Sequence, residues 1–200
     1  MVSSSFSCSE FLRKKFLPSL DLDPTTQKRI HVIGSEGLCE EIRQVGFLVT
    51  CGDDSDTSSM SREDLATYTF PEDPIDAVVV GHDINFTFRK LCIGNVLLQR
   101  NSQAPLIATI LDSFDLVGND ARHIPGNGCV VKALEYSSGR TAINVGKPSK
   151  LLADIVLGDR KIDPSRSMIV GDRLDTDIQF GQSSGMYSAL VLTGVTSASQ

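Results

Sequence analysis

The chain has 200 residues, of which 40% are hydrophobic, and a formal net charge of −6 at pH 7. The acidic balance argues against a nucleic-acid partner, because nucleic acid normally binds a basic face. The sequence contains no run of about 20 apolar residues that could cross a membrane and no secretory signal pattern. Five scattered cysteines without a Cys-x-x-Cys pair indicate reduced thiols, so we expect a cytoplasmic protein with no nucleic-acid or membrane partner.

The first part of the chain alternates between predicted helices and strands. Apolar spacing predicts helices at 9–17, 36–45 and 86–99, and apolar or β-branched runs predict strands at 30–33, 47–49, 75–81 and 105–112. A polar, serine-rich stretch at 53–61 is predicted to be a surface loop. This order is typical of a parallel α/β layer with right-handed crossovers.

The last part continues the alternation without an internal repeat. Helices are predicted at 126–139, closed by Gly139, and at 149–157 and 177–184. Strands are predicted at 168–170 and 188–192, and the apolar run Met168-Ile-Val170 indicates that the first of them is buried.

A cluster of carboxylates follows the strand at 168–170. Gly171 opens a turn that carries Asp172, Asp175 and Asp177. In an open parallel sheet, ligands bind beyond the carboxyl ends of the strands, and Mg²⁺ prefers a few carboxylate oxygens with water and phosphate. The alternative is that these acids only favour the first turn of a helix.

A lysine turn lies upstream, at Gly146-Lys-Pro-Ser149, directly after the apolar stretch 143–145. An ammonium group beside a metal site can neutralise phosphate oxygens. Taken by itself, Lys147 would be interpreted as a solvated surface lysine.

Together these motifs resemble the haloacid dehalogenase superfamily, within it the phosphoglycolate and 4-nitrophenyl phosphatase group that carries a large α/β cap. The resemblance rests on ordered segments with compatible spacing: Val78-Val-Val-Gly-His-Asp83, Pro125-Gly-Asn-Gly-Cys-Val-Val131, Gly146-Lys-Pro-Ser149, Val170-Gly-Asp-Arg-Leu-Asp-Thr-Asp-Ile178 and Leu192-Thr-Gly-Val-Thr196. It implies an α/β fold, with a cap domain at 1–118 and the C-terminal part of a Rossmann-like catalytic core, a half-core, at 119–200.

The resemblance also implies roles for individual residues. Lys147 matches the catalytic lysine that stabilises phosphate, and Asp172 matches a Mg²⁺ ligand. Asp177 matches the second acid, which holds a metal-bound water or the lysine. Asp112 is expected to line the substrate cleft, although Ile110 stands where relatives usually carry Asn. For Arg173 we expect a solvated side chain or a pair with a surface acid.

The nucleophile of the family is not evident in this sequence. Relatives attack phosphorus with an aspartate in an Asp-x-Asp-Gly-Thr-type turn after a buried strand, and the lysine and metal acids cannot replace it. Asp21-Leu-Asp23 follows a cationic, proline-containing segment and lacks the glycine of that turn, so we predict a loop. We therefore expect both ends of the family pattern to be cut and this chain to be incomplete or inactive.

Two functions follow from these expectations. The first is a Mg²⁺-dependent phosphomonoester hydrolase of the phosphoglycolate or 4-nitrophenyl phosphatase type, acting on a small phosphorylated metabolite. The alternative is a non-catalytic, cap-bearing remnant that acts as a binding or dimerisation module, with a homodimer formed through the cap.

Overall fold

A computed structural model describes residues 3–17, 27–51, 61–158 and 161–197. The Asp21-Leu-Asp23 pair and nearly all of the loop predicted at 53–61 lie outside these ranges. No helix of the described part is long and apolar enough to cross a membrane.

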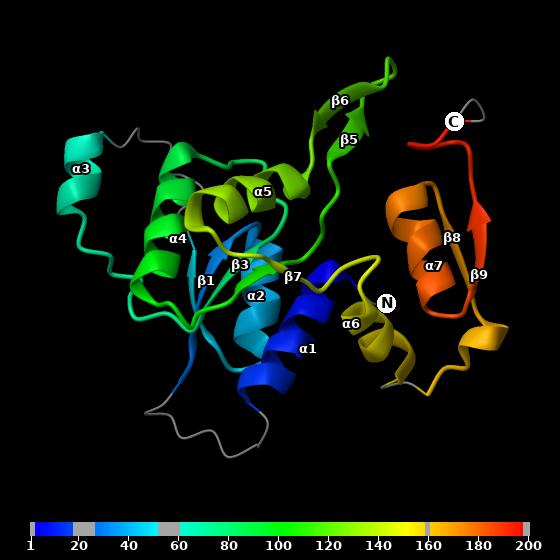
Figure 1. Cartoon of the computed structure of the whole chain (residues 1–200), viewed down its shortest axis with the longest axis horizontal. Helices are drawn as coiled ribbons and strands as arrows, with labels where there is room; N and C mark the ends of the chain where they lie inside the picture. Colours follow the sequence, from blue (N-terminus) through cyan, green and yellow to red (C-terminus); the bar gives the residue numbers. More distant parts are fainter. Residues whose placement is uncertain (1–2, 18–26, 52–60, 159–160, 198–200) are drawn as a thin grey trace.

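The centre of the molecule is a five-stranded parallel sheet (Figure 1). Its strands, in the order β2-β1-β3-β4-β7, are β2 (Leu48–Cys51), β1 (Arg29–Ile33), β3 (Ala77–Val80), β4 (Leu106–Ala108) and β7 (Ile143–Asn144). Every pairing is parallel. The predicted parallel α/β fold is therefore confirmed, and the predicted strands lie within a few residues of their expected positions.

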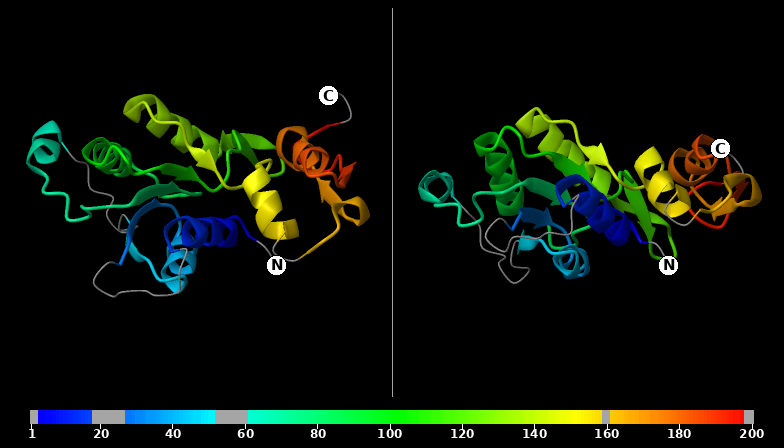
Figure 2. Two further views of the ribbon diagram at one scale, coloured as in Figure 1. Left: turned by 60° about the horizontal axis from the view of Figure 1, so that its bottom comes forward. Right: turned by 90° about the horizontal axis from the view of Figure 1, so that it is seen from below.

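Helices cover both faces of this sheet, as the left view of Figure 2 shows. One face packs against α1 (Ser4–Phe16) and α2 (Glu36–Gln44), and the other against α4 (Phe88–Arg100) and α5 (Asn127–Ser138). In β3, Val78 and Val80 pack on the face covered by α4 and α5, whereas Ala77 and Val79 pack on the face covered by α1 and α2. Alternate residues of a strand point to opposite faces, so a continuous β-branched run is buried on both sides.

Short elements extend from this core. The helix α3 (Arg62–Thr67) has no buried residue and begins at a capping box between Ser61 and Asp64. An antiparallel hairpin of β5 (Phe114–Val117) and β6 (Arg122–Pro125) projects beyond the sheet (Figure 1). We did not predict either element from the sequence.

The C-terminal segment forms a smaller unit beside the sheet (Figure 1). It contains α6 (Lys150–Ala153), a π-helical turn (Asp154–Gly158), a 3₁₀ turn (Pro164–Arg166), β8 (Met168–Gly171), a second π-helical turn (Leu174–Ile178), α7 (Gln179–Ser183) and β9 (Tyr187–Leu190). The strands β8 and β9 pair in parallel with each other.

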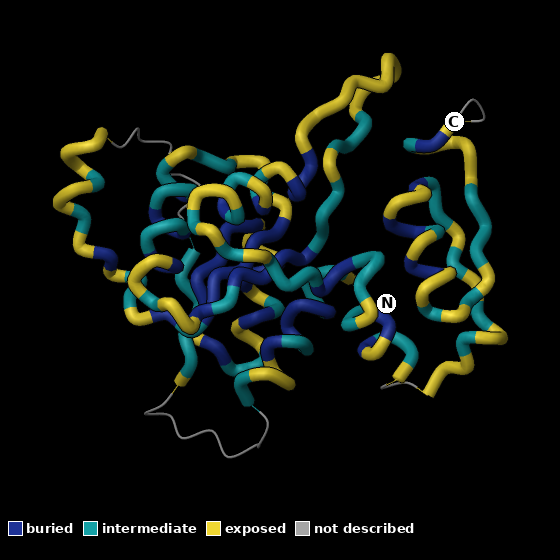
Figure 3. Tube along the Cα trace, in the orientation of Figure 1, coloured by how far each residue is buried: buried dark blue, intermediate teal, exposed yellow. Residues whose placement is uncertain are grey.

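The prediction that the strand at 168–170 is buried is wrong. Met168 and Val170 are each 61% exposed, and the C-terminal strands are largely exposed or half-buried in Figure 3. Within the described residues β8 pairs only with β9, so no third strand and no second layer of side chains covers this face.

The predicted division between residues 118 and 119 falls in the tip of the β5–β6 hairpin. Beyond it, α5 contributes Val131 and Leu134 to the same apolar cluster as β3, and β7 pairs with β4. The domain assignment stays a prediction; these contacts show only that the chain returns to the first sheet before it enters the C-terminal unit.

Candidate functional site

The lysine turn follows β7 at the carboxyl edge of the five-stranded sheet. Asn144 holds the turn with both arms of its amide, because Oδ1 accepts from the Gly146 backbone NH at 2.9 Å and Nδ2 donates to the Lys147 carbonyl at 3.3 Å. A β-carbon on Gly146 would lie 2.1 Å from the carbonyl oxygen of Thr109. Glycine therefore lets the turn pass directly over the end of β4.

The acid turn follows β8. One carboxylate oxygen of Asp172, Oδ2, accepts from the Val195 backbone NH at 2.7 Å, and Asp177 Oδ2 accepts from the Arg173 backbone NH at 3.2 Å. β-carbons on Gly171 and Gly194 would lie 2.2 Å from Asp177 Cγ and 2.0 Å from Asp172 Oδ2. Two glycines thus allow the backbone to approach both carboxylates closely.

The structure brings the two turns into contact. Lys147 Nζ donates to Asp177 Oδ1 at 2.5 Å, which joins residues 30 positions apart. The Asp177 side chain is 7% exposed and that of Lys147 is 42% exposed. The ammonium group is therefore anchored on one side by a buried carboxylate while it remains open to solvent and ligands on the other.

Asp112 lies in the same neighbourhood, after β4. Its Oδ1 lies 3.6 Å from Arg173 Nε. Burial raises the pKa of Asp112, and Arg173 and Lys147 oppose that rise through their positive charges. The charge of Lys147 thus acts on Asp112 as well as on its direct partner Asp177. Three of the four predicted site residues therefore interact electrostatically, and the fourth, Asp172, belongs to the same turn as Asp177.

Arg173 is a member of this site that we did not expect. The prediction of a solvated side chain is wrong, since the residue is 7% exposed. Its NH1 donates to the Phe114 carbonyl at 2.9 Å, and its guanidinium lies 5.2 Å from the centre of the Phe114 ring. The exposed acid Asp175 lies 3.4 Å from its Nε, so the expected pairing with a surface acid is present. No sequence pattern indicates this burial, because it depends on the β5–β6 hairpin, which we did not predict.

The acid turn fits a divalent cation as one part of a site. Only one oxygen of Asp172 accepts a protein hydrogen bond from the described residues, so the other is available as a hard ligand. Both oxygens of Asp177 are occupied by protein donors. The buried hydroxyl of Thr176, in the same turn, has no hydrogen-bond partner within the described ranges. Mg²⁺ needs only one or two carboxylates when water and phosphate complete its shell, so Asp172 fits as one ligand of such an ion.

Comparison with known proteins agrees with this geometry. Residues 144–200, which contain both turns, match the family model described as HAD-hydrolase-like, where HAD stands for haloacid dehalogenase. The chain is 38% identical over 199 residues to phosphoglycolate phosphatase 2 of Arabidopsis thaliana, an alignment that covers 98% of this chain. The C-terminal part of the chain is therefore haloacid dehalogenase-like.

Solved structures of phosphatases are similar to nearly the whole chain. The p-nitrophenyl phosphatase from Archaeoglobus fulgidus superimposes with a TM-score of 0.73 at 25% identity over 98% of this chain. A glycerol phosphate phosphatase from Mycobacterium tuberculosis, in complex with magnesium, superimposes with a TM-score of 0.72 at 28% identity over 97% of it. The chain spans 62% of the Arabidopsis relative, 63% of the Archaeoglobus chain and 49% of the Mycobacterium chain.

Proposed function

We propose that this chain provides the lysine and acid turns of a Mg²⁺-dependent phosphomonoester hydrolase of the phosphoglycolate or 4-nitrophenyl phosphatase type. The observation that carries the proposal is the contact between Lys147 and the buried Asp177, with Asp172 on the same turn. Relatives named as phosphoglycolate phosphatase and p-nitrophenyl phosphatase support the reaction class. The substrate would be a small phosphorylated metabolite.

The residues would divide the work by their chemistry. Asp172 would hold the cation, which when bound neutralises charge on the phosphoryl group. Asp177 fixes the direction of the Lys147 ammonium, which would meet a phosphate oxygen as a compact point charge. Asp112, on the sheet side of the group, would face the part of the substrate beyond the phosphate. The magnesium complex of the Mycobacterium relative supports the choice of metal.

Phosphate and Mg²⁺ binding test the proposal without requiring turnover. We expect isothermal titration to detect Mg²⁺ binding that Asp172→Asn weakens at least about tenfold, as loss of a ligating group does. Inorganic phosphate binding in the presence of Mg²⁺ should weaken similarly in Lys147→Met. Asp175→Asn and Lys150→Gln are matched controls, since both residues lie near the site and are largely exposed. Equal affinities in all five proteins would exclude the proposed site.

Turnover requires a nucleophile that these turns do not contain. We therefore propose that the 200-residue chain alone does not release 4-nitrophenol from 4-nitrophenyl phosphate in the presence of Mg²⁺. The assay should compare the unmodified chain with Asp21→Asn. Turnover that disappears in this variant would show that the loop assignment of Asp21 is wrong.

Exposed apolar side chains favour the alternative, a non-catalytic module that binds a second copy. On the cap side Ile84, in the turn before α4, and Phe88, the first residue of α4, are 86% and 69% exposed. A homodimer through this surface would be detected by sedimentation as a species of twice the chain mass that Phe88→Ser dissociates. A monomer at all concentrations, together with intact Mg²⁺ and phosphate binding, would favour the hydrolase assignment.

A further inference from the structure

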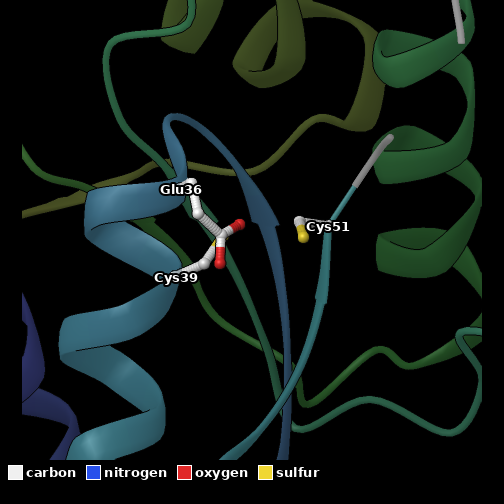
Figure 4. A group of neighbouring side chains, drawn as sticks. All are labelled: Glu36, Cys39 and Cys51. Carbon is white, nitrogen blue, oxygen red and sulfur yellow. The ribbon is translucent and has the colours of Figure 1, made fainter. Parts of the chain in front are cut away.

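A second group of ligand-type side chains lies away from the phosphate site. Glu36, Cys39 and Cys51 each offer one ligand atom, and these atoms all lie within 4.8 Å of one another. In the described residues no other group of three histidine, cysteine or acidic side chains meets this criterion. Figure 4 shows Glu36 and Cys39 on α2 and Cys51 at the end of the edge strand β2.

The fold places these residues by simple rules. Glu36 and Cys39 are three positions apart on α2, so their side chains share one face of the helix. Cys51 is the last residue of β2, and it pairs in register with Val32 of β1. The helix begins directly after β1, so the start of α2 and the carboxyl end of β2 meet at the same edge of the sheet.

We propose that Cys39, Cys51 and Glu36 bind a thiophilic divalent cation of the Zn²⁺ class. Cysteine thiolates and glutamate carboxylates are both zinc ligands, and water can fill a fourth position. Soft sulfur ligands exclude Mg²⁺, so this site is chemically distinct from the acid turn. Binding forms two metal–sulfur bonds and releases the two thiol protons to solvent. The proposal does not rest on the phosphatase assignment.

The cluster is already partly organised without a metal. Cys39 is fully buried, whereas Glu36 is exposed and Cys51 is half-buried. A cation therefore has access from the solvent side and meets a thiol held in the protein interior.

Arg43 occupies the position that a cation would take over. Its guanidinium forms an ion pair with Glu36, and NH2 lies 3.8 Å from Cys51 Sγ. The Arg43 side chain is 41% exposed, so it can turn into solvent when a metal binds. A resident positive charge competes with the metal, and its removal should strengthen metal binding. Substitution of Arg43 should therefore change the metal affinity in the opposite direction to substitution of a ligand.

Cobalt(II) provides the direct test, because thiolate ligation produces a charge-transfer band and tetrahedral geometry produces intense visible bands. The whole chain, kept reduced with a phosphine and checked by thiol counting, is titrated with Co²⁺ and then with Zn²⁺, which should displace it. Cys51→Ala and Glu36→Gln should each weaken binding at least about tenfold, and Arg43→Gln should strengthen it severalfold. Cys129→Ser, at an exposed cysteine outside the cluster, should leave it unchanged.

A second readout separates loss of a ligand from loss of the fold. Zn²⁺ should raise the Tm of the unmodified chain and of Cys129→Ser, because a ligand that binds only the folded state stabilises it. The Tm of Cys51→Ala should not respond, although its circular dichroism in the absence of metal remains that of the unmodified chain. Absence of thiolate–cobalt bands in fully reduced protein, or bands of equal strength in Cys51→Ala, would overturn the proposal.

Discussion

At the scale of single residues, the contact between Lys147 and Asp177 joins the lysine turn to the acid turn. Asp177 is 5% exposed, and both of its carboxylate oxygens accept hydrogen bonds. Lys147 remains 42% exposed, so part of the attraction is screened by water. The stabilising contribution therefore lies below that of a fully buried ion pair and comes largely from satisfying the buried carboxylate.

We predict that Asp177→Asn lowers the free energy of unfolding by about 1–3 kcal/mol. The amide keeps the volume of the side chain but loses its charge and one of its acceptor oxygens. Urea denaturation measures the change. Asp175→Asn, two positions away and 65% exposed, should change stability by less than about 0.5 kcal/mol. Equal effects of the two substitutions would contradict the structural role of Asp177.

A second residue-scale prediction concerns His31, which is 2% exposed in β1 and bonds through Nδ1 to Thr50 Oγ1 at 3.1 Å. Burial lowers its pKa to about 4 from an ordinary value of 6.5. Below pH 6.5 the unfolded chain binds a proton that the folded chain does not accept until about pH 4. The free energy of unfolding should therefore fall as the pH drops through this window, by up to about 3 kcal/mol from this group.

Denaturation at several pH values measures this dependence. Carboxylates also contribute to the loss of stability at acid pH. The comparison between variants therefore isolates the contribution of His31. His31→Gln should flatten the slope between pH 6.5 and 4, whereas His123→Gln, at an exposed position of β6, should preserve it. An unchanged slope in His31→Gln would show that this residue is protonated equally in both states.

At the scale of elements, the lysine turn depends on its close passage over β4. Gly146→Ala would place a β-carbon 2.1 Å from a backbone oxygen, and backbone cannot move aside as a flexible side chain can. We predict a loss of more than about 2 kcal/mol of unfolding free energy. Gly37→Ala, in α2 with no atom within 4 Å of the added carbon, should stabilise the protein by up to about 1 kcal/mol. Thermal unfolding distinguishes the two, and a harmless Gly146→Ala would mean that the turn can shift.

The elements also show what the sequence could predict. Regular apolar spacing located α2 and α4, and the β-branched run located β3, because these patterns are local consequences of helix and strand geometry. The resemblance implies a contact between Lys147 and the second acid, Asp177; the strand ends alone do not predict it, because β7 and β8 belong to different sheets. Burial of β8 was predicted wrongly, because the pattern records an apolar strand but not whether anything covers it. The four-residue strands of the β5–β6 hairpin left no periodic signal, and the burial of Arg173 depends on that hairpin.

At the scale of the whole molecule, Arg173 connects the C-terminal unit to the hairpin. It follows β8 directly, yet it donates to Phe114 in β5 and lies close to Asp112 after β4. The buried guanidinium of Arg173 therefore links the C-terminal unit, which carries the acid turn, to the segment that follows β4. Phe114, the first residue of β5, provides this contact, so Arg173 holds the base of the hairpin beside the acid turn.

We predict that Arg173→Gln loosens the hairpin more than it unfolds the sheet. A charged hydrogen bond contributes about 1.5–3 kcal/mol, and its loss should speed local opening by roughly tenfold or more. Hydrogen exchange of the amides in β5 and β6 measures the change, while those of β1 and β3 should remain protected. Arg122→Gln is the matched control, because Arg122 lies on the same hairpin with its side chain 74% exposed and, among the residues that the structure describes, pairs only with Asp120. If the β5 and β6 amides exchanged at the same rate in both variants, Arg173 would not be what holds the hairpin in place.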